Sequence, residues 1–341
     1  MPLRLPELQD RFRAAVLGFA IGDALGFPYR GLPPTTSQRT QGLAEDFAPK
    51  PRGKFAKGQF SDDTQVLLAA LGAVSRHSRI DGAQVAAHYS WLWQEGVILL
   101  PPANATASAQ SLLRGTPWMG AGAPLGIREP SCLSRGVVAG LWSDDTSTKL
   151  AHDAAVLTVS THKDPVCTAG VVAIARAIQL GLRADPMAPA AFCEEVAKAA
   201  SAADQEFADE VFFLPRVLGW APERAFPSLR KVGVPVAVLE ASPGIPPHVT
   251  PVVLSALYAF LRLPHDFRGA LELLLNLGGE VDVAAGLCAS IFGAHTGCDA
   301  MPARLKKNLL YGEDVVESAD RLFDAKLART LAPAPVLRRR R

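Results

Sequence analysis

The stretch Ser61-Asp62-Asp63-Thr64 stands between a turn that begins at Gly58 and an apolar periodic run that begins at Val66. Two adjacent carboxylates with hydroxyls on both sides do not suit a hydrophobic core, but they are the hard oxygen ligands that divalent cations prefer. A second acidic cluster, Glu280 and Asp282, follows two glycines far downstream. We expect the fold to bring these two clusters together.

Helical spacing of apolar residues begins directly after this stretch. Val66, Leu67, Leu71 and Val74 follow the spacing that keeps side chains on one face of a helix. Ser61 is suited to cap this helix, and such a cap contributes about 0.5–2 kcal/mol. Capping alone would account for the local sequence, so a cation site depends on the downstream partner.

The same periodicity recurs along the chain and predicts an all-α fold. One helix is expected over residues 250–263, with Thr250 as its cap and Pro251 as its first residue, and Asp266 is expected to cap the next. Further helices are predicted at residues 169–181, 190–200, 204–218, 283–294 and 313–328.

Signals for strands and domain boundaries are few. Only residues 232–239 look extended, and Pro235 within them restricts that segment to a sheet edge or a loop. Long loops rich in Gly and Pro are expected at residues 27–58, 101–130 and 221–248, and none of them is typical of a linker between domains. We predict one domain over residues 1–330 and a flexible basic tail over residues 331–341.

A second copy of the acidic tetrapeptide, Ser143-Asp144-Asp145-Thr146, lacks the glycine that precedes the first copy. We interpret it as a helix start, with Ser143 as the cap and two acids in the first turn facing the helix dipole. The first copy is the better candidate for a functional site.

Composition limits the class of function. The chain has 341 residues, 49% of them hydrophobic, and a net charge of +2, so we expect a globular protein with no nucleic-acid partner and no membrane partner. The five cysteines are dispersed and form no C-x-x-C pair, which favours a reducing compartment. Because no signal-peptide pattern or membrane-spanning run occurs, we expect a cytoplasmic protein, and we expect a monomer.

Four stretches, taken in order, resemble motifs of the ADP-ribosylglycohydrolase family, also known from the dinitrogenase reductase-activating glycohydrolases. They are Gly22-Asp23-Ala24-Leu25-Gly26-Phe27-Pro28, similar to G-D-A-x-G-x-P; Ser61-Asp62-Asp63-Thr64, similar to T-D-D-T; Ser160-Thr161-His162-Lys163-Asp164-Pro165, similar to T-H-x-x-P; and Gly278-Gly279-Glu280-Val281-Asp282-Val283-Ala284, similar to G-G-D-x-D-T-x-A. Their order and spacing carry the resemblance, because each motif alone is weak evidence.

The resemblance implies a single orthogonal bundle of many helices, in which helix ends hold one or two Mg²⁺ ions, with Mn²⁺ or Ca²⁺ as alternatives, beside a cleft for ADP-ribose. Carried over residue by residue, the implied metal ligands are Ser61, Asp62, Asp63, Glu280 and Asp282. Asp62 and Asp63 are the implied catalytic residues. The sixth family ligand falls on Val283, which has no oxygen, and Glu280 stands where an aspartate is usual.

Further departures from the family pattern affect the implied substrate contacts. Arg30 stands where many members carry a glutamate, and arginine cannot act as a general base. We expect Arg30 either to bind a diphosphate or to be a solvated loop residue. Arg135 is an expected substrate contact and is kept in a segment, 130–135, that otherwise differs from the family. His162 is expected to contact substrate or to be a structural hydrogen-bonder. Asp23 is expected to contact substrate or, more in keeping with its position, to orient the ligands.

The resemblance therefore implies a metal-dependent hydrolase that cleaves the glycosidic bond of ADP-ribose conjugates, either ADP-ribosylated proteins or small molecules. Two alternatives remain open at this point. The loss of an acid at Arg30 and of a ligand at Val283 is also compatible with an inactive relative that binds ADP-ribose or a related nucleotide. The altered segment 130–135 is compatible with hydrolysis of another N-glycoside.

Overall fold

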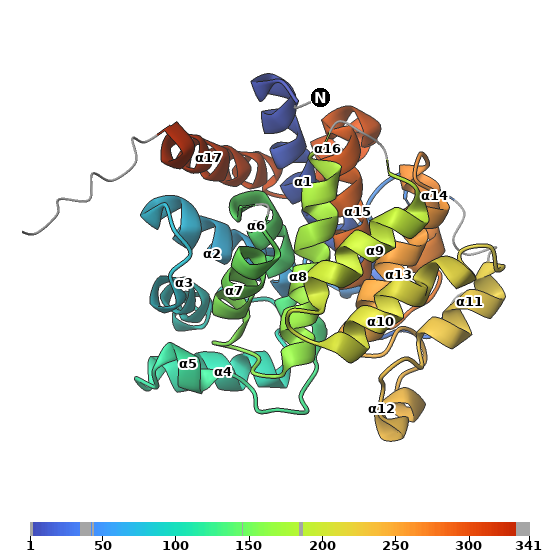
Figure 1. The fold of residues 1–341 in the computed structure, drawn as a ribbon, viewed down its shortest axis with the longest axis horizontal. Coiled ribbons are helices and arrows are strands. Elements are labelled where there is room, and N and C mark those ends of the chain that lie inside the picture. The colour runs from blue at the N-terminus through green and yellow to red at the C-terminus, as the bar shows by residue number, and fades with distance from the viewer. Residues whose placement is uncertain (1–2, 35–41, 43, 145, 184–186, 332–341) are drawn as a thin grey trace, which may run out of the picture.

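A computed structural model describes residues 3–34, 42, 44–144, 146–183 and 187–331 (Figure 1). Within these ranges the chain consists of helices joined by turns and loops, without a β-strand, so the all-α prediction is confirmed. The predicted flexible tail lies outside the described residues beyond Leu331. None of the described helices is both long enough and apolar enough to cross a membrane.

The structure gives the following bounds. The α-helices are α1 Leu5–Gly26, α2 Asp62–His77, α3 Gly82–Gln94, α4 Ala103–Leu113, α5 Trp118–Ala121, α6 Arg135–Trp142, α7 Ser147–Thr158, α8 Pro165–Gly181, α9 Pro189–Ala200, α10 Gln205–Phe213, α11 Pro222–Leu229, α12 Val236–Ala241, α13 Val249–Arg262, α14 Phe267–Leu275, α15 Val281–Thr296, α16 Ala303–Asn308 and α17 Gly312–Leu331. The short 3-10 turns are η1 Phe27–Tyr29, η3 Pro51–Gly53, η4 Pro130–Cys132, η5 Leu214–Val217 and η6 Cys298–Ala300.

Helices α1 and α15 pack against each other along their length near the centre of the molecule (Figure 1). Glycines allow the two helix backbones to approach this closely. A Cβ atom added to Gly22 would lie 2.2 Å from the carbonyl oxygen of Ala285, and one added to Gly293 would lie 2.1 Å from that of Ala14. Because residues four apart share one helix face, Gly18, Gly22 and Gly26 together form a flat contact surface on α1.

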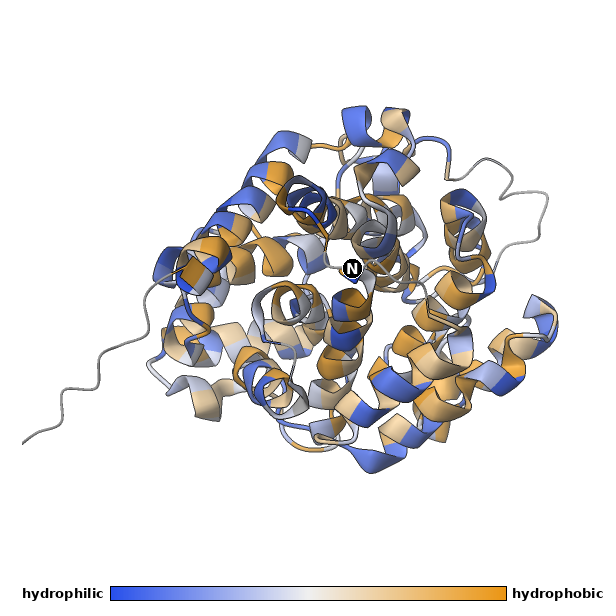
Figure 2. Cartoon of the chain, turned by 45° about the horizontal axis from the view of Figure 1, so that its top comes forward, coloured by the Kyte–Doolittle hydropathy of each residue, from blue (hydrophilic) through white to orange (hydrophobic). Residues whose placement is uncertain are grey.

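The helices around this pair complete one continuous hydrophobic core. A single cluster of buried side chains includes residues of α1, α8, α13, α15 and α17. A smaller cluster, Val66, Tyr89, Leu92 and Ala109, lies between α2, α3 and α4. In Figure 2 the outward faces of the peripheral helices are largely hydrophilic.

Two of the predicted loops contain helices, and this part of the sequence prediction was wrong. Residues 101–130 include α4 and α5, and residues 221–248 include α11 and α12. The segment 232–239 is a turn followed by the start of α12 and not an extended strand. Pro235 is the N-cap of α12 with φ −59°, so it starts a helix, and the Arg230 guanidinium donates to the carbonyls of Leu239 and Ser242 at its other end.

Two predicted helix starts also lie elsewhere. Ser143 is the C-cap of α6, and its hydroxyl donates to Asp153, whereas α7 has Thr146 as its N-cap; Asp145 lies outside the described residues. Helix α13 begins one residue before Thr250, because the side chain of His248 accepts from the Thr250 N–H and caps it. The predicted caps Ser61 and Asp266 are confirmed.

The contact between α1 and α15 predicts a strong effect of one added methyl group. We expect Gly22→Ala to lower the free energy of unfolding by about 1–3 kcal/mol, since the Cβ would overlap the α15 backbone and force the helices apart. The measurement is urea denaturation followed by circular dichroism.

Gly72→Ala is the matched control. Gly72 lies inside α2, where a Cβ would be 3.5 Å from His88 and so in ordinary contact. We expect this change to be neutral or to stabilise the protein by up to about 1 kcal/mol through helix propensity. Equal losses of stability in the two variants would contradict a special role for the helix contact.

Candidate functional site

The two acidic clusters of the sequence lie at the N-termini of two helices. Ser61 caps α2, with its hydroxyl accepting from the Asp63 N–H at 3.1 Å, and this places Asp62 and Asp63 in the first turn. Asp282 lies in the first turn of α15, and Glu280 is the N-cap residue of that helix. The positive ends of both helix dipoles stabilise carboxylates at these positions.

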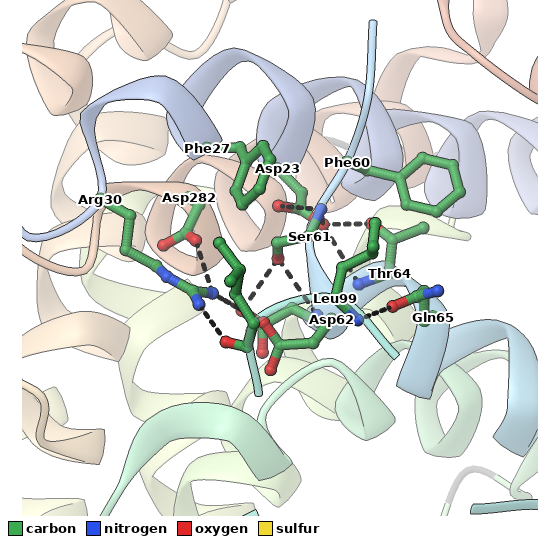
Figure 3. A network of polar contacts seen from close by, with 12 residues as sticks. Asp23, Phe27, Arg30, Phe60, Ser61, Asp62, Thr64, Gln65, Leu99 and Asp282 are labelled. Atoms are coloured by element: carbon green, nitrogen blue, oxygen red, sulfur yellow. Dashed lines mark hydrogen bonds and ion pairs between the residues drawn. The ribbon is translucent and has the colours of Figure 1, made fainter. Parts of the chain in front are cut away.

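The guanidinium of Arg30 joins the two clusters (Figure 3). Its Nη1 donates to Asp62 Oδ1 at 2.7 Å and to Asp282 Oδ2 at 3.1 Å, and it lies 4.0 Å from Asp63 Oδ2. The side chains of Asp62 and Asp282 are 3% and 0% exposed, so these ion pairs are shielded from solvent. The prediction that the fold brings the acidic clusters together is confirmed.

Several contacts hold Arg30 in this position. The Gly31 N–H donates to the Gly279 carbonyl at 2.9 Å, and the Gly279 N–H donates to the Leu32 carbonyl at 2.9 Å, so the loop after η1 is paired with the residues before α15. Arg52 donates to the Arg30 carbonyl at 3.0 Å. Arg30 Nη2 donates to the Leu100 carbonyl at 2.6 Å.

This arrangement corrects one expectation for Arg30. The side chain is 16% exposed and bonded to buried carboxylates, so Arg30 is not a solvated loop residue. Contact with a diphosphate stays a prediction, but the guanidinium already shares its charge with Asp62 and Asp282.

Asp23 of α1 orients the first acidic cluster, as expected. Its carboxylate accepts hydrogen bonds from the Ser61 N–H at 3.0 Å, from the Thr64 N–H at 3.1 Å and from the Thr64 hydroxyl at 2.5 Å. These bonds satisfy N–H groups at the start of α2 that have no partner inside the helix. The close contact of α1 with α15 therefore also positions α2.

Burial dominates the electrostatics of the acidic groups. Burial and the charge of Asp282 raise the pKa of Asp23 to about 7 and that of Glu280 to about 8. Burial also raises the pKa of Asp62 to about 6, although Arg30 opposes this shift, and it raises the pKa of Asp63 well above its usual range. Arg30 itself loses hydration on burial, but the facing carboxylates outweigh this effect and raise its pKa.

Arg135 lies in the protein interior and not at a substrate surface. It is 1% exposed, donates to the Thr161 hydroxyl at 2.5 Å and to the Leu157 carbonyl at 3.2 Å, and lies over the Tyr89 ring. A contact between Arg135 and the substrate stays a prediction. These contacts hold α6 against the end of α7, so the residue has a structural role.

His162 is also buried, and its Nδ1 is 2.9 Å from the Thr161 hydroxyl. Burial lowers the pKa of His162 to about 3, so its ring is neutral near pH 7. This geometry matches the structural alternative for His162. A substrate contact stays a prediction, because its buried Nε2 has no hydrogen-bond partner among the described residues.

Glu129 was missed by the sequence analysis. It precedes η4 and accepts from the Asn104 amide at 3.1 Å through Oε2, while its buried Oε1 has no partner among the described residues. Burial raises the pKa of Glu129, and the charges of Asp62 and Arg30 also act on it. Glu129 lies in a predicted loop, and its local sequence did not indicate that it is buried, because its burial depends on α4.

A divalent cation does not fit the site in this arrangement. Arg30 is bonded to one oxygen of Asp62 and to one oxygen of Asp282, and Val283 is 1% exposed and belongs to the core. Asp282 Oδ1 is buried and has no hydrogen-bond partner in the described part of the chain, but one oxygen does not form a metal shell. In the same part of the chain, no three His, Cys, Asp or Glu side chains are arranged around a common ion position.

A groove of about 1270 Å³ adjoins the site between α2, α3 and α17. The acids of the two clusters do not line it, but Gln65 and Leu99 do. The Leu99 N–H donates to the Gln65 side chain at 2.8 Å, and that side chain donates to the Val97 carbonyl at 2.8 Å. The loop between α3 and α4 is thus fixed to α2 on one side and to Arg30 on the other.

Comparison with known proteins agrees with the fold and with the motifs. An uncharacterized protein from Archaeoglobus fulgidus is 26% identical over 320 residues, which cover 93% of this chain and 97% of that protein. A solved structure described as an ADP-ribosylglycohydrolase-related protein complex has a TM-score of 0.70 and 22% identity, and the match covers 94% of this chain and 99% of that one. The latter likeness shows the fold alone.

The family comparison covers both halves of the site. The family described as ADP-ribosylglycohydrolase matches residues 4–331, a range that includes Asp23 on α1, the start of α2 and the start of α15. With the fold, the order of the motifs and the meeting of the two acidic clusters already in place, this match shows that the chain belongs to the ADP-ribosylglycohydrolase family.

Proposed function

We propose that this chain is a glycosidic hydrolase that releases ADP-ribose from a conjugated protein side chain or small molecule. The observation that carries the proposal is the convergence of the N-termini of α2 and α15, which places Asp62 and Asp282 on the same guanidinium nitrogen. Family membership supports the reaction class, and the substrate is our proposal.

The reaction adds water across the bond between the anomeric carbon and its substituent. The water oxygen bonds to the anomeric carbon, one proton goes to a base, and the leaving group takes a proton as its bond breaks. Positive charge develops on the ribose in the transition state, and clustered carboxylates stabilise such charge.

Asp62 is the group best suited to accept the proton from water. A pKa of about 6 makes Asp62 a stronger base than an ordinary aspartate, yet it is still mostly ionised at pH 7. Burial and the charge of Asp62 raise the pKa of Asp63 well above its usual range. In this proposal Asp62 acts as the base, while Asp63 adjusts the charge of the cluster.

Glu129 is suited to protonate the leaving group. Its pKa is raised by burial, and one of its oxygens has no protein partner in the described part of the chain. Arg30 stands where many family members carry a glutamate, and a permanently protonated arginine cannot take part in proton transfer in place of that acid. We propose that Glu129 supplies the proton.

One observation favours a second candidate function. With Arg30 bonded to Asp62 and Asp282, the carboxylates are already neutralised in part, which suits a protein that binds ADP-ribose without cleaving it. Calorimetry with ADP-ribose, run beside turnover assays on arginine-, serine- and nucleotide-linked ADP-ribose, separates the two functions. Tight binding without turnover would favour the binding protein.

Asp62, the proposed base, and its neighbour Asp63 can be replaced together. We expect the double variant Asp62→Asn, Asp63→Asn to release ADP-ribose at least about 100-fold more slowly, because neither amide can accept a proton from water. The measurement is chromatographic detection of ADP-ribose from the best substrate of the panel. Retention of full activity would remove both residues from the mechanism.

Asp81→Asn is the control for that variant. Asp81 caps α3 through its side chain, and asparagine caps helices equally well. The charged partner of Asp81 is Arg79, which does not belong to the acidic cluster. We expect wild-type activity.

The second prediction concerns the proton donor. We expect Glu129→Gln to lower kcat by about 100-fold or more with little change in KM, since glutamine keeps the shape but has no acidic proton. A substrate whose leaving group needs no protonation should be cleaved almost as fast as by the wild type. If both substrates lose the same fraction of activity, Glu129 is a structural residue.

A further inference from the structure

The acidic cluster contains a cation supplied by the chain. Arg30 Nη1 lies between Asp62 of α2 and Asp282 of α15 at hydrogen-bond distance from both, with Asp63 at 4.0 Å. One positive group thus faces three carboxylates from two helices. Arginine remains protonated in proteins, so this positive charge is permanent.

The position of Arg30 is built into the fold and does not depend on a solvent-exposed side chain. Its backbone is tied to Gly279, where a Cβ would lie 2.1 Å from the Ile245 carbonyl oxygen, so the paired segments have no room to shift. Its guanidinium also donates to the Leu100 carbonyl, and it lies 6.0 Å from the centre of the Phe27 ring. Backbone, carbonyl and ring contacts together fix the charge at one point.

A divalent cation and Arg30 compete for the same oxygens. Magnesium requires oxygens at about 2.0–2.1 Å, whereas the guanidinium nitrogen is held at 2.7 and 3.1 Å from the two carboxylates. For a metal to enter, Arg30 would have to leave, and its charge would then lose both partners.

We infer that Arg30 is the resident cation of this site and occupies the position that family resemblance gives to a metal. The site of this chain therefore works without a bound divalent cation. Binding of Mg²⁺, Mn²⁺ or Ca²⁺, which the resemblance implies, stays a prediction, and a measurement of ion uptake decides it. This inference concerns the same site as the proposed function, but its test measures ion uptake and is independent of hydrolysis.

The test compares the uptake of Mn²⁺ by the full chain and its variants after treatment with a chelator. Free Mn²⁺ is measured by electron paramagnetic resonance, and the unfolding temperature is measured with and without Mg²⁺. For the wild type we expect no stoichiometric Mn²⁺ uptake and an unfolding temperature that Mg²⁺ leaves unchanged.

Arg30→Ala opens the carboxylates. We expect it to bind Mn²⁺ at least about tenfold more tightly than the wild type, a difference of about 1.4 kcal/mol. Its unfolding temperature should be lower than that of the wild type without metal and should rise with Mg²⁺, because the cation then pairs the unpartnered carboxylates.

Two further variants complete the comparison. Arg30→Lys keeps a positive charge and should remain unresponsive to Mn²⁺. Arg13→Gln removes another arginine–aspartate pair of this chain, with Asp320, outside the acidic cluster, and it should also remain unresponsive.

Either of two results would overturn the inference. One is stoichiometric Mn²⁺ uptake by the wild type at an affinity equal to that of Arg30→Ala. The other is the absence of Mn²⁺ uptake by folded Arg30→Ala. If Arg30→Ala does not fold, the wild-type titration and Arg30→Lys still decide between the resident arginine and a metal.

Discussion

The close packing of α1 against α15 is the constraint on which the site depends. Glycines on both helices let the backbones approach until there is no room for a Cβ, and Gly26 of α1 lies against the backbone of Asp282 itself. Asp23 projects from the same part of α1 and binds the start of α2. One interface thus positions two helix N-termini that are far apart in sequence. The geometry of the site is therefore as well defined as the packing of the core.

Placing so many acids together requires compensation, and the structure provides it in three forms. The helix N-termini contribute partial positive charge, N–H and hydroxyl donors satisfy Asp23, and Arg30 contributes a full charge to Asp62 and Asp282. Removing one partner from a buried ion pair is far more costly than never forming it. The acids and Arg30 are therefore interdependent: a change to one alters the protonation and position of the others.

The sequence predicted those parts of the structure that depend on local patterns. Serine before two acids and an apolar stripe predicted the capped start of α2, and the paired motifs predicted that the acidic clusters meet. The short helices α4, α5, α11 and α12 lie in segments whose glycines and prolines indicate loops. Pro102, Pro117 and Pro235 instead occupy the N-cap positions of α4, α5 and α12. In the second acidic copy, Ser143 ends one helix, and the prediction that it starts the next was wrong.

The position of the Arg30 side chain could not be predicted from local sequence patterns. It follows from pairing between residues 30–32 and 278–279, which are brought together only by the complete fold, and from a carbonyl at Leu100. Burial of Glu129 and of Arg135 likewise depends on neighbours distant in sequence. Residue type alone indicated a solvated or substrate-binding arginine, and tertiary structure determined that one guanidinium joins the acids while the other supports the core.

The loop whose carbonyl accepts a hydrogen bond from Arg30 also lines the neighbouring groove. Leu100 has a φ of 51°, a left-handed conformation that is uncommon for leucine, and its carbonyl accepts from Arg30 while the preceding Leu99 is held by Gln65 at the wall of the groove. A molecule in the groove that displaces Leu99 therefore also displaces the anchor of Arg30. Any such coupling would be reciprocal, so a molecule in the groove and a molecule at the acidic cluster would change each other's binding free energy by the same amount.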